Sequence, residues 1–370
     1  MKKIIVYAYS DVNFDTRILK QCEALAANGH KVEFHGVKYG KHSLKNDFST
    51  KFYFKRPKKI LVQYLQYFLF CLITLVVQLK DLHRRPIIIV HNMPNFLVLP
   101  FFISRLFGAT IILDIHDDSY LAFKKYFKNR LLLKFISVLE MTLSLKVPHK
   151  LITVNRILAD HLKVICNKQI LVIHNYPNSS KSNQKDSYRI GKTIKLVYLG
   201  HLGSHYDLRT LIDYIKNITE VPISLDIYGD GFQRESLERH VKSINLDSIV
   251  NFHGRYLAND IPQILQKYDV GVAMYEVTNF TNVLLPVKLL EYTQNQLPAI
   301  ATRLVGTELY FREDSLIYIE NFEDFSNSIN AIHSGNLSLD EVSAGALIDV
   351  NPLLWEKESK KFLDYVAVNV

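Results

Sequence analysis

Short runs of apolar, β-branched residues recur along the chain and alternate with stretches of helical periodicity. In the first half the runs are Lys3–Tyr9, Lys31–Val37, Ile87–His91, Thr110–His116, Leu151–Val154 and Ile170–His174. They lack the strict alternation of half-buried strands, which is typical of strands buried on both faces of a parallel sheet. Helices are predicted between them, for example over Thr16–Asn28, where Gly29 provides a stop signal.

The pattern restarts after a polar linker at 178–187. The second set of runs is Lys195–Leu199, Ile223–Tyr228, Val250–His253, Val270–Met274, Ala299–Thr302 and Leu316–Ile319. Two successive β/α sets predict an α/β protein of two Rossmann-like, doubly wound parallel-sheet domains that face each other across a cleft. We expect the first domain at 1–180 and the second at 190–352, with a C-terminal helix at about 353–370 that packs back on the first.

Composition fits this architecture and excludes several protein classes. The chain has 370 residues, of which 48% are hydrophobic and 22% charged, so it is a globular protein of about two domains and not a disordered chain. Its cysteines, Cys22, Cys71 and Cys166, are too few and too widely spaced for a disulfide framework or a paired-cysteine zinc site. The first apolar run, Ile4–Tyr9, is too short for the core of a signal peptide, so we expect a cytoplasmic protein.

The net charge of +9 is unevenly distributed. Residues 1–180 hold 27 basic and 11 acidic side chains, a net charge of +16, whereas the remainder has a net charge of −7. A basic half suits an anionic partner, which is either nucleic acid or anionic lipid. Solubility charge on solvated helices is the alternative interpretation.

An uncharged stretch, Ile60–Leu79, favours lipid and argues against nucleic acid. It follows directly on a basic cluster made of Lys55, Arg56, Lys58 and Lys59. Its polar side chains, Gln63, Gln66, Thr74 and Gln78, share one narrow stripe at about 100° per residue. The length reaches the roughly 20 residues of a spanning helix, but the stripe favours a buried or interfacial helix. A second basic and apolar segment, 124–139, repeats the theme, so we expect peripheral attachment to an anionic membrane surface, on the inner face of the cytoplasmic membrane.

Polar residues that directly follow strands are candidate site residues, because ligands bind beyond the carboxyl ends of parallel strands. In the first half they are Ser10, Asp11, His91, Asn92, His116, Asp117, Asp118, Asn155, His174 and Asn175. Any one of them could instead cap a helix or form a turn. In the second half they are glycines, which let the backbone approach a phosphate: Gly200, Gly203, Gly229, Gly231 and Gly254. Neither a Gly-x-Gly-x-x-Gly nor a P-loop pattern is present, which weakens the dinucleotide and P-loop hypotheses.

The segment Leu285–Tyr292 carries the strongest chemical signal. Pro286 suits the first turn of a helix, whose N-terminus has free amides and a partial positive charge. Lys288 and Glu291 are three residues apart and share one face of that helix. A cation and free amides would hold a diphosphate, and a carboxylate would accept both hydroxyls of a ribose. A surface ion pair between the two side chains is the alternative.

In their order and spacing these motifs resemble those of the GT-B glycosyltransferases of retaining family 4 (group 1). The resemblance covers essentially the whole chain and is carried by Asp15-Thr-Arg17, 24–32, His91-Asn-Met-Pro, Asp114-Ile-His-Asp117, Ile173-His-Asn-Tyr-Pro, the glycine turns and Pro286–Tyr292. It implies an enzyme that moves a sugar from a UDP- or GDP-sugar to a lipid-linked or growing cell-surface polysaccharide. It also implies retention of configuration and no bound metal or other cofactor.

The resemblance assigns roles in the donor site. Glu291 corresponds to the second glutamate of the family's two-glutamate motif, which binds the ribose, whereas the first glutamate is replaced by Val283. The loop Asn282, Val283, Leu284 and Leu285 would offer backbone amides to the sugar and phosphate. His201 and His205 stand where the family has a phosphate-binding Arg and Lys, and Lys288 or Arg209 would compensate for them.

The remaining roles concern the donor turns and the first domain. Gly200, Gly229, Asp230 and Gly231 would line the nucleotide site. His116 resembles the family's active-site histidine near the donor sugar, so His116, Lys288 and Glu291 are the expected catalytic set. The expected acceptor or cleft residues are Asp15, Arg17, His91, Asn92, Asp117 and Asn175.

Two other hypotheses stay open at this point. The replacements at Val283, His201 and His205 are compatible with a non-catalytic GT-B subunit that binds a nucleotide or a partner enzyme. A nucleotide-sugar epimerase shares the fold and would act without an acceptor. Sugar transfer is the hypothesis that the sequence favours.

Overall fold

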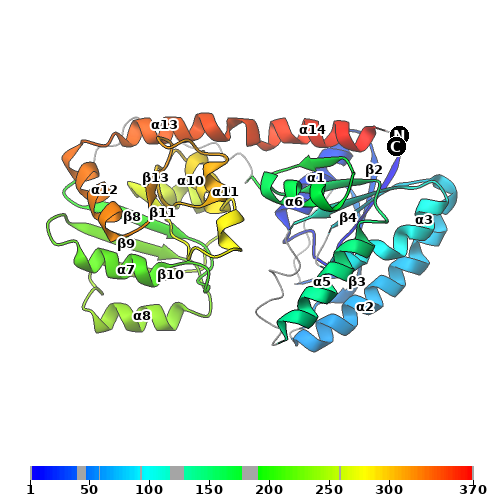
Figure 1. Cartoon of the computed structure of the whole chain (residues 1–370), viewed down its shortest axis with the longest axis horizontal. Helices are drawn as coiled ribbons and strands as arrows, with labels where there is room; N and C mark the ends of the chain where they lie inside the picture. The colour runs from blue at the N-terminus through cyan, green and yellow to red at the C-terminus, as the bar shows by residue number, and fades with distance from the viewer. Residues whose placement is uncertain are drawn as a thin grey trace. The chain divides into compact units, whose positions relative to one another are not determined.

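A computed structural model describes residues 2–39, 47–57, 59–91, 94–116, 129–176, 191–257 and 260–368, and its contacts divide the chain into two units (Figure 1). Unit 1 comprises Met1–Asn175 and Glu356–Val370, and unit 2 comprises Tyr176–Trp355. Each unit is built on one parallel sheet, which confirms the predicted α/β class. The predicted linker, residues 124–128 of the second basic and apolar segment, and four expected residues, Lys58, Asn92, Asp117 and Asp118, lie outside the described residues.

The sheet of unit 1 has seven parallel strands in the order β3-β2-β1-β4-β5-β6-β7. They are β1 (Lys3–Tyr7), β2 (Lys31–Lys38), β3 (Ser49–Lys55), β4 (Ile87–His91), β5 (Thr110–Ile115), β6 (Lys150–Thr153) and β7 (Ile170–Val172). The helices are α1 (Thr16–Ala27), α2 (Ile60–Val77), η1 (Gln78–Arg84), η2 (Asn95–Phe101), α3 (Phe102–Leu106), α5 (Arg130–Ser144), α6 (Arg156–Ile165) and α14 (Trp355–Ala367). Strand β1 pairs with β2 on one side and β4 on the other, so the strand order reverses at β1, where parallel sheets bind their ligands.

Unit 2 has six parallel strands in the order β10-β9-β8-β11-β12-β13. They are β8 (Ile194–Leu199), β9 (Ile223–Tyr228), β10 (Val250–Gly254), β11 (Val270–Ala273), β12 (Ala299–Thr302) and β13 (Ile317–Ile319). The helices are α7 (Leu208–Asn217), α8 (Arg234–Ser243), α9 (Ile261–Leu265), η4 (Thr281–Val283), α10 (Val287–Gln294), α11 (Val305–Glu308), α12 (Phe322–Ser334), α13 (Leu339–Val350) and η5 (Asn351–Leu353). Every run of residues predicted as a strand in either unit forms one, with ends shifted by at most two residues.

The sheet of unit 2 is covered on both faces. Along β8 the side chains alternate, so that Leu196 and Tyr198 join one buried apolar cluster, while Val197 and Leu199 join the other. The second cluster also contains Leu289 and Leu290 of α10. Burial on both sides explains why β8 is almost continuously apolar. The burial of Leu289 and Leu290 also fixes α10 against the sheet, and this holds the other side chains of the helix in place.

Strand β3 was not predicted from the sequence. It is an edge strand that pairs only with β2, and its residues are partly buried or exposed, none fully buried. Its sequence, Ser-Thr-Lys-Phe-Tyr-Phe-Lys, mixes lysines with aromatics and merges into the basic cluster that ends at Lys59. Lys51 pairs with Glu33 of β2, and charged side chains of this kind are typical of edge strands.

The C-terminal helix α14 belongs to unit 1 by its contacts. Glu358 is buried and accepts hydrogen bonds from the backbone amide and Nδ1 of His174, at 2.7 and 2.6 Å. At the other end of the helix, the Lys150 amine donates to the carbonyl oxygens of Tyr365 and Val368, at 2.7 and 2.6 Å. These buried polar contacts hold both ends of α14 on the edge of the unit 1 sheet.

Candidate active site

A buried ion pair lies at the carboxyl ends of the unit 1 strands. Arg17 of α1 donates through Nε and Nη2 to the two carboxylate oxygens of Asp114, at 3.0 and 2.9 Å, and Gln21 donates to Asp114 Oδ2 at 2.7 Å. The Arg17 guanidinium also reaches the Ile173 carbonyl oxygen at 2.6 Å. Burial alone would raise the pKa of Asp114, but Arg17 and the neighbouring histidines outweigh it and hold that pKa well below its usual range.

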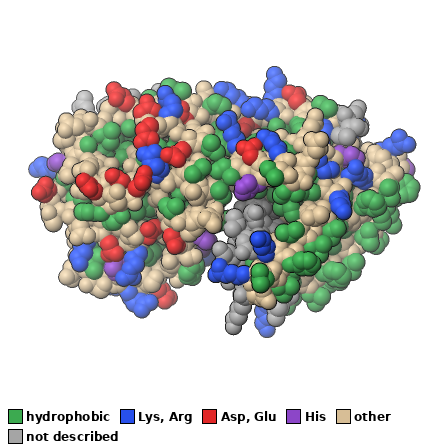
Figure 2. Space-filling view, viewed as in Figure 1, with side chains coloured by type: hydrophobic (Ala, Val, Ile, Leu, Met, Phe, Trp, Pro, Cys, Tyr) green, Lys and Arg blue, Asp and Glu red, His purple; other side chains and the backbone are tan. Residues whose placement is uncertain are grey.

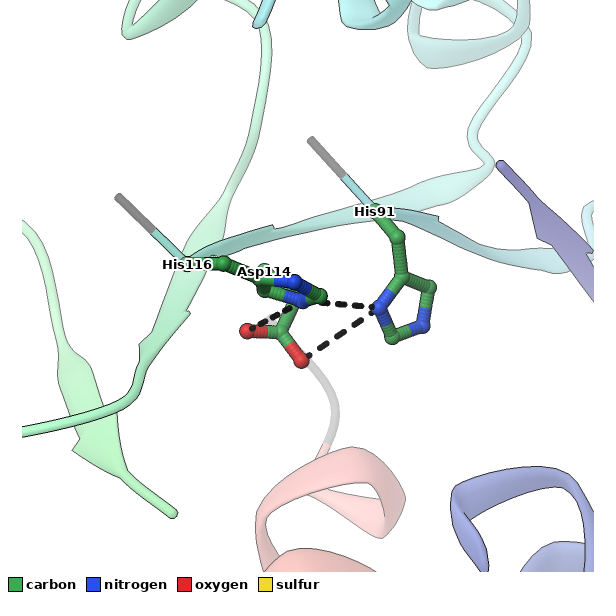
Figure 3. A group of neighbouring side chains, drawn as sticks. All are labelled: His91, Asp114 and His116. Carbon is green, nitrogen blue, oxygen red and sulfur yellow. Dashed lines mark hydrogen bonds and ion pairs between the residues drawn. The ribbon is translucent and has the colours of Figure 1, made fainter. Parts of the chain in front are cut away.

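Two histidines stand beside this carboxylate (Figure 3). His91 ends β4 and His116 directly follows β5, and His91 Nδ1 lies 3.2 Å from His116 Nε2. Each ring also approaches Asp114, at 3.5 Å from Nδ1 of His91 and from Nε2 of His116. Burial lowers the pKa of His91 to about 4, with Asp114 opposing the shift, so His91 is neutral at neutral pH. The sequence analysis selected His91 and His116 because each follows or ends a strand, and the structure places them next to each other.

These three side chains have the spacing of a metal site, since their ligand atoms lie within 4.8 Å of one another. The surroundings argue against that use. Both oxygens of Asp114 already accept hydrogen bonds from Arg17, and a guanidinium beside a carboxylate opposes the approach of a second cation. We interpret the group as a hydrogen-bonded network around Asp114.

The other candidates in unit 1 have structural partners. Asp15 caps α1 by accepting from the Ile18 amide at 3.2 Å, and Arg17 is committed to Asp114. His174 is held by Glu358 of α14, and Asn175 is exposed at the end of unit 1. Asp15 and Arg17 were expected to be acceptor or cleft residues; in the structure Asp15 caps α1 and Arg17 ties that helix to the sheet, and their role toward an acceptor stays a prediction.

In unit 2 two glycine turns shape a pocket of about 440 Å³. It is lined by Gly200, His201, Asp230, Gly231, Arg255 and Tyr256. Gly229 has a φ of +144°, and a Cβ at this position would lie 1.7 Å from the Gly200 carbonyl oxygen. Only glycine fits where the turns after β8 and β9 approach so closely. The predicted turn residues therefore come together at the carboxyl ends of these strands.

Lys288 of α10 lies directly behind this pocket. Its side chain is 6% exposed, and a Cβ on Gly200 would lie 3.3 Å from its amine. Three tyrosine rings surround the amine, with centroids at 3.6, 4.2 and 5.4 Å for Tyr198, Tyr206 and Tyr275. Within the described residues the amine has no hydrogen-bond partner. Burial lowers the pKa of Lys288 well below its usual value, and Glu291 opposes the shift.

Glu291 lies one turn further along α10. Burial raises its pKa to about 7, and Lys288 opposes that shift. Burial and the charge of Glu291 both raise the pKa of Tyr256, which lines the pocket. Lys288 is thus buried and Glu291 is partly buried, next to the pocket. An exposed surface ion pair, the alternative drawn from the sequence, does not describe them.

Other expected donor residues lie elsewhere in unit 2. His201 lines the pocket, but among the described residues His205 does not, and its ring packs on Phe280 with centroids 5.2 Å apart. Arg209 is exposed on α7, and nothing in the described part of unit 2 places it at the pocket. Of the two cations that the resemblance implied as compensating ones, Lys288 lies next to Gly200 of the pocket, and Arg209 is not among the described residues that line it.

The loop before α10 also differs from expectation. It was expected to present amides to a ligand, but the amides of Asn282 and Leu284 donate to carbonyl oxygens of Thr278 and Thr281, at 2.9 and 3.1 Å. The loop forms the 3-10 turn η4, which uses these donors internally. The side chain of Asn282 accepts from the Val305 amide, while Leu284 and Leu285 pack on the core. Val283 ends η4 and is not among the described residues that line the pocket.

Several pocket residues were missed by the sequence analysis. Arg255 and Tyr256 directly follow Gly254, the last residue of β10, so the rule that strand ends carry ligands was enough to find them. The tyrosines around Lys288 had no such signal. Tyr198 lies within a strand, and a buried tyrosine in a sequence looks like any other core residue.

The comparisons with known proteins agree with this geometry. Residues 193–334 match the family model described as glycosyl transferases group 1. Among solved structures, the sucrose-phosphate synthase of Thermosynechococcus elongatus superposes with a TM-score of 0.75 at 14% identity, covering 99% of this chain and 98% of that one. Anabaena HepE in complex with UDP and glucose gives 0.69 at 12% identity, with 99% and 100% covered. WaaG, a glycosyltransferase involved in lipopolysaccharide biosynthesis, gives 0.69 at 16% identity, with 99% and 100% covered. No curated protein sequence matches the chain.

The two parallel-sheet units and these structural likenesses define the GT-B fold, and the matched domain makes the protein a glycosyltransferase. More closely, its second unit carries the domain of the group 1 glycosyl transferases. The resemblance stated from the sequence motifs is thereby confirmed at the level of fold, class and enzyme.

Proposed function

We propose that the protein transfers a sugar from a UDP- or GDP-sugar to a lipid-linked or growing cell-surface polysaccharide, with retention and without a bound metal, as family 4 enzymes do. The amine of Lys288, which has no hydrogen-bond partner among the described residues, carries the proposal. A buried amine without a hydrogen-bond acceptor is costly, so its presence next to a glycine-lined pocket calls for an anion from outside the chain.

A nucleoside diphosphate is the anion that fits this position. The glycine turns let phosphate oxygens approach the backbone, and α10 begins beside Lys288 with the partial positive charge of a helix N-terminus. The structural neighbour HepE was crystallised with UDP and with UDP-glucose. The pocket also offers Tyr256 as an aromatic face and Glu291 nearby as an acceptor for ribose hydroxyls.

These residues act on the leaving group. When the bond between sugar and diphosphate breaks, negative charge grows on the phosphate oxygens, and a fixed cation with helix-end amides stabilises that charge. The buried, solvent-poor surroundings of Lys288 strengthen this interaction. The arriving diphosphate also supplies the counter-charge that the free pocket lacks, which favours the protonated amine.

A donor panel tests the proposal. Purified protein is incubated with labelled UDP- and GDP-sugars, with and without membrane-extracted lipid-linked acceptor, and products are separated by mass. We expect one donor to be consumed with transfer to acceptor and no loss of rate in EDTA, since Lys288 supplies the positive charge. Conversion of the donor without an acceptor would indicate an epimerase instead. No turnover of any donor by folded protein would contradict the enzyme and favour the non-catalytic subunit.

The helix α2 supports a membrane-held acceptor because its polar side faces inward. Val62–Arg84 is long and apolar enough to cross a membrane, and 22% of its apolar window is buried. The predicted polar stripe faces the protein. Gln66 accepts a hydrogen bond from Tyr9 at 2.8 Å, and Gln78 is buried and donates to the Pro100 carbonyl oxygen at 2.7 Å. A helix that buries its polar stripe and exposes its apolar arc suits a lipid surface and not water.

Neighbouring helices extend this apolar surface. Helices α2, α3 and α5 all contact η2, and hydrophobic side chains gather over α2 and α5 (Figure 2). The exposed residues are Val62, Tyr64, Leu65, Phe68, Leu69, Leu72 and Val76 of α2, Phe102 and Leu106 of α3, and Leu131, Leu132, Phe135, Val138, Leu139 and Leu143 of α5. The exposed basic residues Lys55, Arg56, Lys59, Arg130 and Lys134 flank α2 or lie on α5. Their charge is complementary to anionic lipid, so we propose attachment in the plane of the membrane at its cytoplasmic face.

Replacing two apolar side chains of α2 by glutamate is expected to weaken this attachment strongly. Leu65 and Phe68 are 61% and 60% exposed, so the change leaves the core intact. Each buried Leu or Phe contributes about 1.5–3 kcal/mol, so the double variant should bind vesicles of phosphatidylcholine and phosphatidylglycerol at least roughly tenfold more weakly. Flotation of the vesicles measures the bound fraction.

The matched control is Val164→Glu, which changes an 88% exposed apolar residue on α6, a helix that packs on β7 and not on η2. It should float like the unaltered protein. Equal flotation of the double variant and the unaltered protein would contradict the membrane face. If alkaline carbonate did not extract the protein from cell membranes, a spanning helix would be indicated instead.

A further inference from the structure

We propose that His91 is a positioning residue that donates a hydrogen bond from Nδ1 to Nε2 of His116 and thereby fixes the ring and the tautomer of that active-site histidine. The inference rests on the proposed function and on the resemblance, which implies that His116 is an active-site histidine. It gives a specific role to His91 of β4, which the sequence analysis expected only as an acceptor or cleft residue.

The two histidines differ in access. The His91 side chain is 1% exposed, whereas that of His116 is 19% exposed. A ligand can therefore meet His116 directly, but His91 reaches a ligand only through its neighbour. Figure 3 shows the His91 ring directed at His116 and Asp114 together. Its effect on a reaction must be exerted through them.

The hydrogen bond between the two rings then determines the tautomer of each histidine. His91 Nδ1 and His116 Nε2 are 3.2 Å apart, and a hydrogen bond between two imidazole nitrogens needs one donor and one acceptor. His91 Nε2 is buried without a partner among the described residues, and an orphaned N–H is costlier to bury than an orphaned acceptor. The proton of His91 therefore lies on Nδ1, with His116 Nε2 as its acceptor. Neutral His116 then carries its own proton on Nδ1.

The groups around the pair keep this arrangement in place. Asp114 of β5 faces both rings at 3.5 Å, Arg17 of α1 holds that carboxylate, and the charge of Asp15 also reaches His91. Arg17 donates to both carboxylate oxygens, so Asp114 is a fixed negative charge beside both rings. The contact between His91 Nδ1 and His116 Nε2, at 3.2 Å, is shorter than the 3.5 Å from either ring to Asp114.

The test compares His91→Phe with His91→Asn. Phenylalanine keeps the volume of the ring and removes its nitrogens, whereas an asparagine amide places a donor near the position of Nδ1. We expect kcat to fall at least about tenfold in His91→Phe, with KM for the donor unchanged because unit 2 holds the nucleotide. His91→Asn should recover most of that loss. The control is His161→Phe, at an exposed position on α6, which should retain kcat.

A spectroscopic readout tests the tautomer without activity. In protein labelled with ¹⁵N-histidine, two-bond couplings report which ring nitrogen carries the proton, and His116→Gln assigns the signal. We expect an Nδ1–H tautomer for His116, replaced by a mixture in His91→Phe. An Nε2–H tautomer in the unaltered protein would overturn the proposal, even if His91→Phe failed to fold.

The outcomes separate this inference from the proposed function. If no donor is turned over but His116 holds the Nδ1–H tautomer, the function fails and the hydrogen-bond assignment stands. If the unaltered protein transfers sugar and His91→Phe has the same kcat, the positioning role is overturned. Equal loss of kcat and of thermal stability in the Phe and Asn variants would also overturn it, since a purely structural role would not distinguish them.

Discussion

Replacing Lys288 by methionine is expected to weaken donor binding by about 100-fold while leaving the thermal stability of the protein unchanged or higher. The two effects have opposite signs because the amine has no hydrogen-bond partner among the described residues. Hydrogen bonds to charged groups contribute about 1.5–3 kcal/mol, so losing the interaction with a diphosphate costs about that much. An apolar side chain of similar length removes a buried, uncompensated amine, which is neutral or stabilising for the fold.

The matched control for this variant is Lys267→Met, at an exposed position of the same unit. Isothermal titration with the nucleoside diphosphate measures affinity, and a thermal melt measures stability. The control should match the unaltered protein in both. Retained affinity in Lys288→Met would exclude the amine as the phosphate-binding cation. A melting point lowered by several degrees would show that the amine makes a stabilising contact in the free protein.

Replacing Asp114 by asparagine is expected to have the largest effect on stability, a loss of about 3–5 kcal/mol. The change keeps the shape of the side chain but leaves the buried Arg17 guanidinium without its counter-charge. Asp160→Asn is the matched control, because Asp160 pairs with Lys163 at 2.7 Å on an exposed face. An exposed pair contributes at most about 1 kcal/mol, so urea unfolding of the control should be nearly unchanged.

The same pair gives an expected pH dependence. The pKa of Asp114 is lower in the folded protein than in the unfolded chain, so its stabilisation is complete above the unfolded value, about 3.9, and is lost as the pH falls through the folded value. The difference in unfolding free energy between the unaltered protein and Asp114→Asn should therefore stay constant from neutral pH to about pH 5. A difference that already shrinks between pH 7 and pH 5 would show that Arg17 does not hold the carboxylate.

The sequence predicted the sheets well because burial on both faces leaves a clear mark. Strands such as Ile87–His91 and Ala299–Thr302 are unbroken apolar runs, and burial allows little else there. Strand β3 left no such mark, because an edge strand pairs on one side only and tolerates lysines. Helix α2 was recognised from its polar stripe, and that stripe faces inward through contacts such as the one between Gln78 and Pro100.

For the site, the sequence could name residue types but not their partners. Lys288 and Glu291 were identified from a helix start, and they lie next to the pocket that Gly200 helps to form. Arg17 was also identified, but its partner Asp114 is 97 positions away, and no local pattern says that the two form a pair. The same limit applies to Tyr206 and Tyr275, which only the fold brings to Lys288.

The position of α14 in the sequence affects the order in which the protein can fold during synthesis. Unit 1 contains α14, but the ribosome makes α14 only after all of unit 2, so the two segments of unit 1 emerge about 180 residues apart. Unit 2 is one continuous segment and can close during translation. Until α14 has been made, His174 lacks its hydrogen bond to Glu358, and Lys150 lacks its hydrogen bonds to the carbonyl oxygens of Tyr365 and Val368. Unit 1 therefore gains these contacts at the edge of its sheet only after residues 356–368 have been synthesised.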